Sequence, residues 1–235
     1  SGQEHLRLYQ RPGEDVGIGL MGPFVETNMF GHRYALAGYD FFNHSLITIP
    51  LRDKQPTAVA RAIVTQYLMV RSCPRRFHSD RGEEFLSEVL QEVNRLLSVG
   101  HRFSSSYRPQ SGGQTERSHR FLNDAISIQS KKNDHRDWDL WMYGATFAHN
   151  ATVLPGTDGL TPFFLEFGRE PVVIEEVGVQ MHPLLPLTKD NYAKAILQRI
   201  EHGRREWCAQ NAEQRENQKR KHDAGVTPVT LRKGD

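Results

Sequence analysis

The sequence predicts one α/β domain with a mixed sheet, followed by a long polar helix. Three short apolar segments separated by turn residues predict three strands near the N-terminus, and helical patterns then alternate with two further short strands. This order is typical of a mixed sheet covered by helices. A length of 235 residues and a hydrophobic content of 37% fit one large domain, with or without an appendage, and exclude a wholly disordered chain.

The first three strands are predicted to form a meander. Apolar residues alternate with glycines over 16–20, and this strand ends before Gly22-Pro23. Segments 34–39 and 46–49 follow, and Asn43-His44 supplies the turn between them. The turn spacing predicts that neighbouring strands of this unit pair with each other.

Two helices and two strands are predicted next. A helix opens at Pro56, segment 76–79 is a short strand, a second helix ends at Gly100, and 101–104 is another strand. The predicted inward stripe of the first helix is Val59, Ile63, Tyr67 and Leu68. The predicted stripe of the second helix is Phe85, Val89, Val93 and Leu96.

The second half of the chain is predicted to be mainly helical. A Ser/Pro/Gly-rich loop at 104–113 precedes a helix over 114–130, and an aromatic helix spans 138–151. A short apolar element over 161–168 closes with a glycine. The residues predicted to face inward from the first of these helices are Phe121, Ala125 and Ile128.

The domain boundaries follow from changes in composition. Residues 1–14 form a polar lead-in, 15–170 the core, 171–190 an irregular Pro/Val-rich connector, and 191–224 a linker helix. The apolar stripe of the linker helix includes Trp207, and its remainder is polar on all sides, as in a solvent-crossing spacer or a partner surface.

The charge balance limits the possible ligands. Thirty Lys and Arg against 28 Asp and Glu give a net charge of +2, so nucleic acid binding would require a local basic patch. No apolar run approaches the ~20 residues of a membrane span. Two cysteines exclude a disulfide framework and a Cys-rich zinc site within this chain, and they favour an intracellular protein.

Two acidic residues are the candidate catalytic groups. Asp80 follows the strand 76–79, at the carboxyl end where open α/β sheets bind ligands, although it could instead cap the next helix. Glu116 lies early in a helix behind the loop, where an ordinary interaction with the helix dipole is the alternative. The two residues are separated by 35 intervening residues.

This spacing resembles the catalytic core of retroviral and gypsy-type retrotransposon integrases, which carry Asp, Asp, 35 residues and Glu on a ribonuclease-H-like fold. The resemblance implies a five-stranded mixed sheet flanked by helices, and strand transfer at two Mg²⁺ or Mn²⁺ ions about 3.5–4 Å apart. The stretches that carry the resemblance are 16–23, Tyr39-Asp40, Ser79 to Gly82, Tyr107 to Arg117, Phe147 to Asn150 and Thr161 to Pro171.

The sequence departs from this pattern at its first acidic position, which falls on Gly19 when counted back from Gly22-Pro23. Asp15 lies ~13 Å away along an extended strand and cannot replace it, whereas Asp40 stays open as a substitute. We therefore predict a degenerate site with Asp80 and Glu116 as its metal ligands, and with Mg²⁺ or Mn²⁺ weakly held or absent. Glycine, rather than the Asn or Ala of a typical designed knockout, favours natural loss.

The resemblance also implies binding partners. The positions that match DNA-facing residues are Tyr107, Arg108, Gln114, Arg117, His119, Arg120 and Asn123, with a solvated helix face as the alternative. We expect a homodimer through the helix 138–151, with the linker helix that carries Trp207 as a second contact, host proteins as further partners, a nuclear location and no membrane association. Residues 225–235 resemble the entry to the small β-barrel that follows integrase cores, so a truncated barrel is expected, and no zinc domain precedes the core.

Two functions are compatible with these patterns. The first is a domesticated, non-catalytic module derived from an integrase, which acts through self-association, partner binding or DNA binding. The second is an active polynucleotidyl transferase that joins element DNA ends to target DNA, with another acid completing the site. A degraded domain without a selected role is the third possibility.

Overall fold

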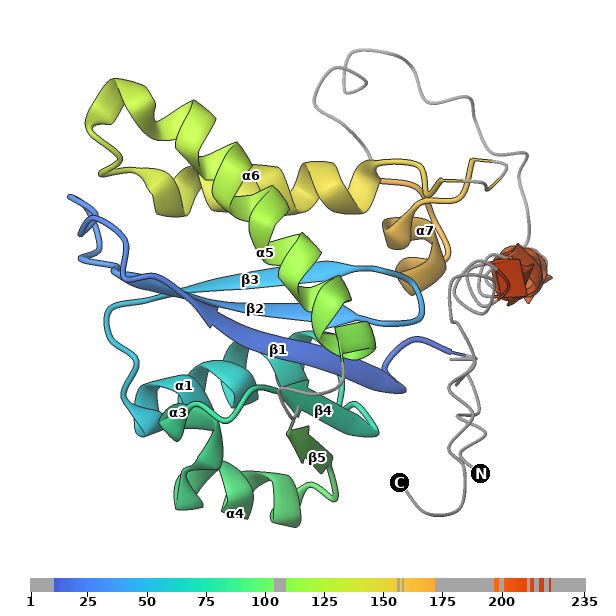
Figure 1. Ribbon diagram of the computed structural model, residues 1–235, viewed down its shortest axis with the longest axis horizontal. Helices are drawn as coiled ribbons and strands as arrows, with labels where there is room; N and C mark the ends of the chain where they lie inside the picture. The colour runs from blue at the N-terminus through green and yellow to red at the C-terminus, as the bar shows by residue number, and fades with distance from the viewer. Residues whose placement is uncertain are drawn as a thin grey trace, which may run out of the picture.

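The structure is a computed structural model (Figure 1). It describes residues 11–103, 109–155, 157, 159–171, 197–198, 201–210, 212–213, 216–217 and 220, without the side chains of 109–117, 129, 132 and 133. Most of the predicted lead-in, connector and linker helix and all of the barrel entry lie outside these residues, so their boundaries stay predictions.

The centre of the fold is one five-stranded sheet with the strand order β3-β2-β1-β4-β5. Its strands are β1 (Asp15–Met21), β2 (Tyr34–Asp40), β3 (Leu46–Leu51), β4 (Arg76–Ser79) and β5 (Gly100–Phe103). The first three pair antiparallel, whereas β4 lies parallel to β1 and β5 parallel to β4. The predicted five-stranded mixed sheet is therefore confirmed.

Helices cover both faces of the sheet, and Figure 1 shows α5 crossing over the strands on one side. The helices of the opposite face are α1 (Pro56–Ala62), the π-helix η1 (Ile63–Leu68), α2 (Met69–Arg71), α3 (Glu83–Leu86) and α4 (Glu88–Leu96). The other elements are α5 (Pro109–Gln129), the 3-10 helix η2 (Ser130–Asn133), α6 (Trp138–Ala151) and α7 (Pro162–Phe167).

The alternation of side chains along each strand divides the core into two layers. Val16 and Ile18 of β1 pack with the α1 side, where the predicted stripe from Val59 to Leu68 is buried as expected. Met21 of the same strand packs on the other face, with Leu122 of α5 and Trp138 of α6. Gly19 lies between these apolar positions, on the face that α5 covers.

The predicted inward stripe of α5 is wrong. Leu122 and Ile126 are buried against the sheet, whereas Phe121 and Ile128 are 40% and 66% exposed. The sequence offers two overlapping apolar stripes one residue apart, and the contact with β1 and β2 decides between them. The helix also begins at Pro109 rather than at residue 114, since proline is well suited to the first helical turn.

The second predicted helix is divided in two at Ser87, whose backbone is extended. Its hydroxyl accepts a hydrogen bond from the Leu90 backbone N–H at 3.4 Å and so caps a new helix, α4. The restart rotates the buried face onto Leu90 and Asn94, and leaves Val89 and Leu96 exposed. Of the four residues in the predicted stripe, only Phe85 is buried, because the cap at Ser87 interrupts the helical period.

Residues 201–210 are helical and pack against α7. The Trp207 side chain is 2% exposed and lies among Phe42, Leu160 and Phe164. Because Trp207 is buried within its own chain, its side chain is not available as a dimer contact, and the second contact expected of the linker helix stays a prediction. No helix within the described residues is long and apolar enough to cross a membrane.

Candidate active site

The predicted site lies where β1 and β4 end side by side. The parallel register pairs Asp15 with Arg76 and Gly17 with His78. Continued for two residues along each strand, the same register places Gly19 beside Asp80. The two positions that the sequence motifs singled out therefore lie two residues beyond the last paired residues of these neighbouring strands.

The end of β4 is fixed by a network of neutral side chains. The Ser79 hydroxyl donates to the Asp80 carbonyl at 2.8 Å and lies 2.9 Å from Nε2 of His101. The Asn94 amide lies 3.2 Å from Nδ1 of His101, so Nε2 carries the ring proton and donates to Ser79. Burial, together with the charge of His78, lowers the pKa of His101 to about 4 and keeps this ring neutral.

The Asp80 carboxylate is exposed, and its Oδ1 accepts a hydrogen bond from the Gly82 N–H at 3.0 Å. Asp80 therefore supports the turn before α3, but the alternative prediction that it caps this helix is wrong, because the N-cap of α3 is Gly82 and no side chain caps the helix. Glu84 points to the same place, because a Cβ atom on Gly82 would lie 2.6 Å from Glu84 Oε1 and 3.2 Å from Asp80 Oδ1. Glu84 was not among the predicted site residues, although its position in the first turn of a helix behind Asp80 could have indicated it.

The space above Gly19 is taken by the imidazole of His119, which comes from α5. A Cβ atom at position 19 would lie 2.6 Å from Cε1 and 3.1 Å from Nε2 of that ring. His119 was expected to be a DNA-facing residue. Its contact with Gly19 could not be predicted from the sequence, because the contact depends on how α5 crosses the sheet.

Asp15 is committed elsewhere in the structure. Arg76 donates to its two oxygens at 2.7 and 2.6 Å, and His78 Nε2 lies 2.6 Å from Oδ1. Burial acts to raise the pKa of Asp15, but the hydrogen bonds from His78 and Arg76 outweigh it and hold that pKa at about 2. Asp15 is therefore a buried structural anion, as its distance from the site in the sequence predicted.

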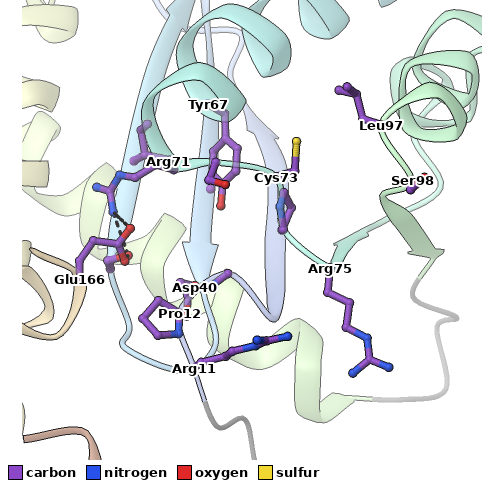
Figure 2. A pocket seen from close by; sticks show the side chains of 16 residues that line it. Arg11, Pro12, Asp40, Tyr67, Arg71, Cys73, Arg75, Leu97, Ser98 and Glu166 are labelled. Atoms are coloured by element: carbon purple, nitrogen blue, oxygen red, sulfur yellow. Dashed lines mark hydrogen bonds and ion pairs between the residues drawn. The ribbon is translucent and has the colours of Figure 1, made fainter. Parts of the chain in front are cut away.

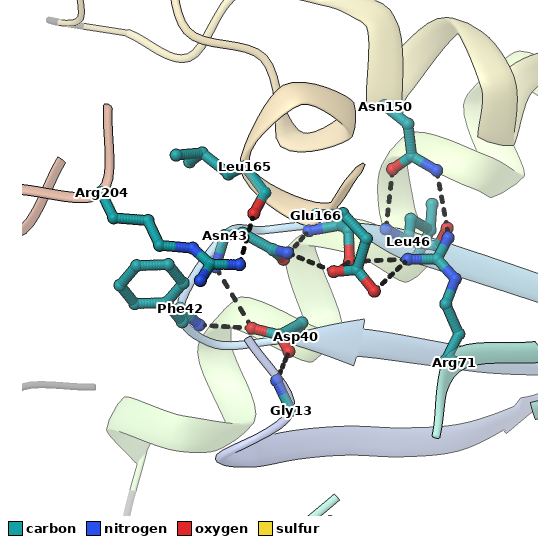
Figure 3. A network of polar contacts seen from close by, with 11 residues as sticks. Gly13, Asp40, Phe42, Asn43, Leu46, Arg71, Asn150, Leu165, Glu166 and Arg204 are labelled. Carbon is teal, nitrogen blue, oxygen red and sulfur yellow. Dashed lines mark hydrogen bonds and ion pairs between the residues drawn. The ribbon is translucent and has the colours of Figure 1, made fainter. Parts of the chain in front are cut away.

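Asp40, which the sequence left open as a substitute ligand, lies at the wrong end of the sheet. It pairs with Val16 at the start of β1, whereas Gly19 is near the end of that strand. Figure 3 shows its carboxylate accepting backbone hydrogen bonds from Gly13, Phe42 and Asn43, at 2.6, 2.7 and 3.2 Å. Burial raises its pKa to about 6. Asp40 shapes the β2–β3 turn and does not replace the missing acid.

A polar cavity of about 430 Å³ lies at this same end of the sheet (Figure 2). Arg71 from α2 forms an ion pair of 3.2 Å with Glu166 from α7 beside it. Gly19 and Asp80 do not line this cavity. Residues that line it are Arg11, Asp40, Tyr67, Arg71, Cys73 and Arg75.

The remaining predicted site residues lie on or before α5. The backbone of this helix carries Gln114, Glu116 and Arg117, whose side chains are outside the described residues, as are Tyr107 and Arg108. Arg120 and Asn123 are exposed, and His119 is half-buried. The assignments to metal and DNA therefore stay predictions.

The residues at the ends of β1 and β4 do not fit a pair of divalent ions. Two ions need carboxylates that bridge them and screen their repulsion. Gly19 provides no ligand, and an imidazole fills the space beside it. Among the described side chains, no group of three or more His, Cys, Asp or Glu residues is placed to hold a metal ion, and the Glu116 side chain lies outside that set.

Known proteins resemble this chain in sequence. The chain is 29% identical over 147 residues, 63% of its length, to the Gag-Pol polyprotein of feline leukemia virus. It is 26% identical over 221 residues, 94% of its length, to the retrovirus-related Pol polyprotein from transposon 412 of Drosophila melanogaster. These matches span 8% and 18% of the two polyproteins. No protein-family model matches the chain.

Solved structures share its fold. The HTLV-2 integrase catalytic core domain in complex with magnesium, in a trimeric form, superposes with a TM-score of 0.54 at 14% identity, over 66% of this chain and 97% of that one. This chain is therefore similar in sequence to retroviral and retrotransposon Pol polyproteins and similar in fold to an integrase catalytic core. The simian T-cell lymphotropic virus intasome in complex with PP2A regulatory subunit B56 gamma matches over 78% of this chain and 63% of its own chain, with a TM-score of 0.60 at 16% identity.

Proposed function

We propose that this integrase-like core is a domesticated module that does not catalyse strand transfer and acts by binding a second copy, DNA or host proteins. One observation carries the proposal: the position beside Asp80 is a glycine, and His119 occupies the space above it. A two-ion centre contributes mainly by positioning metal ions and stabilising charge. With the first carboxylate missing, Asp80 and Glu116 are left to hold two dications.

The proposed loss of metal binding distinguishes this chain from its structural neighbour. The HTLV-2 integrase core is a complex with magnesium. Here the two acids considered as substitutes for the first position are used for other purposes, because Asp15 holds Arg76 and Asp40 holds the β2–β3 turn. We therefore propose that Mg²⁺ and Mn²⁺ bind weakly or not at all.

Self-association is supported by the exposed face of α6. Four large side chains of this helix are between 42% and 51% exposed: Leu140, Trp141, Tyr143 and Phe147. Apolar side chains gathered on one helix in this way mark interfaces, and twofold pairing is the commonest arrangement of identical chains. The HTLV-2 integrase core has been solved in dimeric and trimeric forms. We propose a homodimer that buries this α6 face.

DNA and host proteins are the other proposed partners. Arg120 and Asn123 are exposed on α5, on the helix that also carries Arg117. Guanidinium groups on an exposed helix can neutralise phosphates. The neighbour from simian T-cell lymphotropic virus is an intasome in complex with a PP2A regulatory subunit. A nuclear location follows from this proposal.

Titration with Mn²⁺ tests the catalytic part of the proposal. We expect the native chain and Asp80→Asn to show the same weak or absent heat of Mn²⁺ binding. We expect both to lack strand transfer on a labelled DNA end. Tight Mn²⁺ binding that Asp80→Asn abolishes, together with strand transfer, would establish an active integrase instead. A Glu84→Gln variant then shows whether Glu84 is the acid that completes the site, since it is the described carboxylate that faces Asp80 across Gly82.

A further inference from the structure

The contact between Gly19 and His119 carries a consequence for both residues. The three atoms nearest to a Cβ at position 19 all belong to one imidazole: Cε1 at 2.6 Å, Nε2 at 3.1 Å and Nδ1 at 3.8 Å. Non-bonded carbon atoms in contact stay about 3.5–4.0 Å apart. Even the single methyl group of alanine at position 19 would therefore overlap the ring as it stands, and the carboxyl group of aspartate reaches further still.

The position of the His119 ring is restrained by the helix that bears it. Ser118, Leu122 and Ile126 of α5 are buried, which fixes the rotation of the helix about its axis. The helix packs on β1, so its backbone cannot retreat without opening the layer formed by Leu122, Met21 and Trp138. The ring can escape a side chain at position 19 only by changing its own rotamer.

We infer that Gly19 and His119 form a complementary pair, in which the His119 ring fills the volume that a side chain at position 19 would occupy. The ring packs α5 onto β1 at the end of the sheet beside Asp80. Neither residue can be changed alone without cost: a larger residue at position 19 collides with the ring, and a smaller residue at position 119 leaves a cavity over the glycine.

The pair also determines how the site could regain its carboxylate. Replacing Gly19 by aspartate leaves the new side chain against the His119 ring, so this change alone does not form a metal site. Shortening His119 at the same time opens the space for the carboxylate beside Asp80. This consequence rests on the proposed loss of the two-ion site, whereas the packing of the pair does not.

A double-mutant cycle tests the packing. The four proteins are the native chain, Gly19→Ala, His119→Ala and the double variant, and the measurement is urea unfolding. We expect Gly19→Ala to lower the folded-to-unfolded ratio about tenfold in the native chain but less than about threefold in the His119→Ala background. Equal losses in the two backgrounds would overturn the inference. Gly144→Ala is the matched control, because a Cβ there meets no atom within 4 Å.

Two additions keep the test decisive if a variant fails to fold. If Gly19→Ala is unfolded, the comparison of His119→Ala with the double variant replaces it, and the folded-to-unfolded ratio of the double variant should be lower by less than about threefold. If His119→Ala is unfolded, His119→Asn takes its place in the cycle. Titration of Gly19→Asp and of Gly19→Asp/His119→Ala with Mn²⁺ tests the consequence for metal binding. We expect only the double variant to bind Mn²⁺. Equal binding by Gly19→Asp would show that the His119 ring moves freely.

The two proposals fail in different ways. Tight Mn²⁺ binding by the native chain would overturn the proposed loss of the metal site, and it would leave the result of the double-mutant cycle unaffected. Additive changes in unfolding free energy across the cycle would overturn the complementary pair and would leave the proposed lack of catalysis unaffected.

Discussion

The indole Nε1 of Trp207 donates a hydrogen bond to the backbone carbonyl of Phe42, and this bond fixes the C-terminal helical segment to the turn between β2 and β3. The indole ring is buried among side chains from α7 and the segment before it. Arg204 strengthens the same junction by donating to the Leu165 carbonyl at 3.3 Å. The helix 201–210 is therefore part of the folded core at its first turns.

Removal of this anchor should destabilise the whole domain. Trp207→Ala is expected to lower the free energy of unfolding by about 3–5 kcal/mol, as for other large buried aromatic residues. Urea unfolding followed by circular dichroism measures the change. Arg205→Ala is the control, because its side chain is 80% exposed, and a change below about 0.5 kcal/mol is expected there. Equal losses in the two variants would show that the helix is not docked through Trp207.

Two glycines should respond in opposite ways to alanine. Gly203 faces α7, where a Cβ would lie 2.9 Å from Cε1 of Phe164, so Gly203→Ala is expected to destabilise the protein by about 1–3 kcal/mol. Gly144 is an exposed position within α6 with no atom within 4 Å of its Cβ site, so Gly144→Ala should stabilise by about 0.5–1 kcal/mol. Thermal unfolding of both variants gives the comparison. Stabilisation by Gly203→Ala would contradict the close packing of this helix on α7.

The sheet could be predicted from the sequence because its signals are local. Alternating residues and turn chemistry determined β1 to β3, and the short strands β4 and β5 were indicated by the turns that bound them. The helical faces were less predictable. In α5 two stripes compete, and only the packing of Leu122 on the sheet selects one. Ser87 caps a new helix, and this role was not predictable because not every serine near a helix acts as a cap.

The site was predictable in its positions and not in its contacts. Motif spacing led to Gly19 and Asp80, which lie two residues beyond the last pair of the parallel strands β1 and β4. The proximity of Glu84 to Asp80 and of His119 to Gly19 depends on side-chain directions across elements distant in sequence. The place of Asp40 became clear only once its backbone partners were known.

Dimerisation should depend on the exposed face of α6. Trp141→Glu is expected to convert a homodimer to monomers at tens of micromolar protein, because it places a charge in an apolar contact that must be desolvated. Sedimentation velocity measures the change. Leu96→Glu is the control, since Leu96 is a large apolar residue on α4 that is 65% exposed, against 43% for Trp141. A native chain that remains monomeric at these concentrations would contradict the proposed interface.

Acid sensitivity should come partly from Asp15. Its pKa is about 2 in the folded protein against 3.8 for the free group, so it contributes about 2 kcal/mol of stability above pH 4. Because the folded pKa is the lower one, the unfolded chain binds the proton first, and this contribution is lost as the pH falls from about 4 towards 2. The native chain should therefore lose stability more steeply over this range than Asp15→Asn.

The control for this prediction is another carboxylate paired with an arginine. Glu92 and Arg95 form an exposed ion pair of 2.7 Å, in which the hydrogen bond from Arg95 lowers the pKa of Glu92. Exposed pairs of this kind contribute little, because water and salt screen them. Thermal unfolding of Glu92→Gln should follow the native pH dependence, whereas Asp15→Asn should flatten it. Parallel curves for the native chain and Asp15→Asn would show that Arg76 and His78 do not stabilise the ionised Asp15 carboxylate in the folded state.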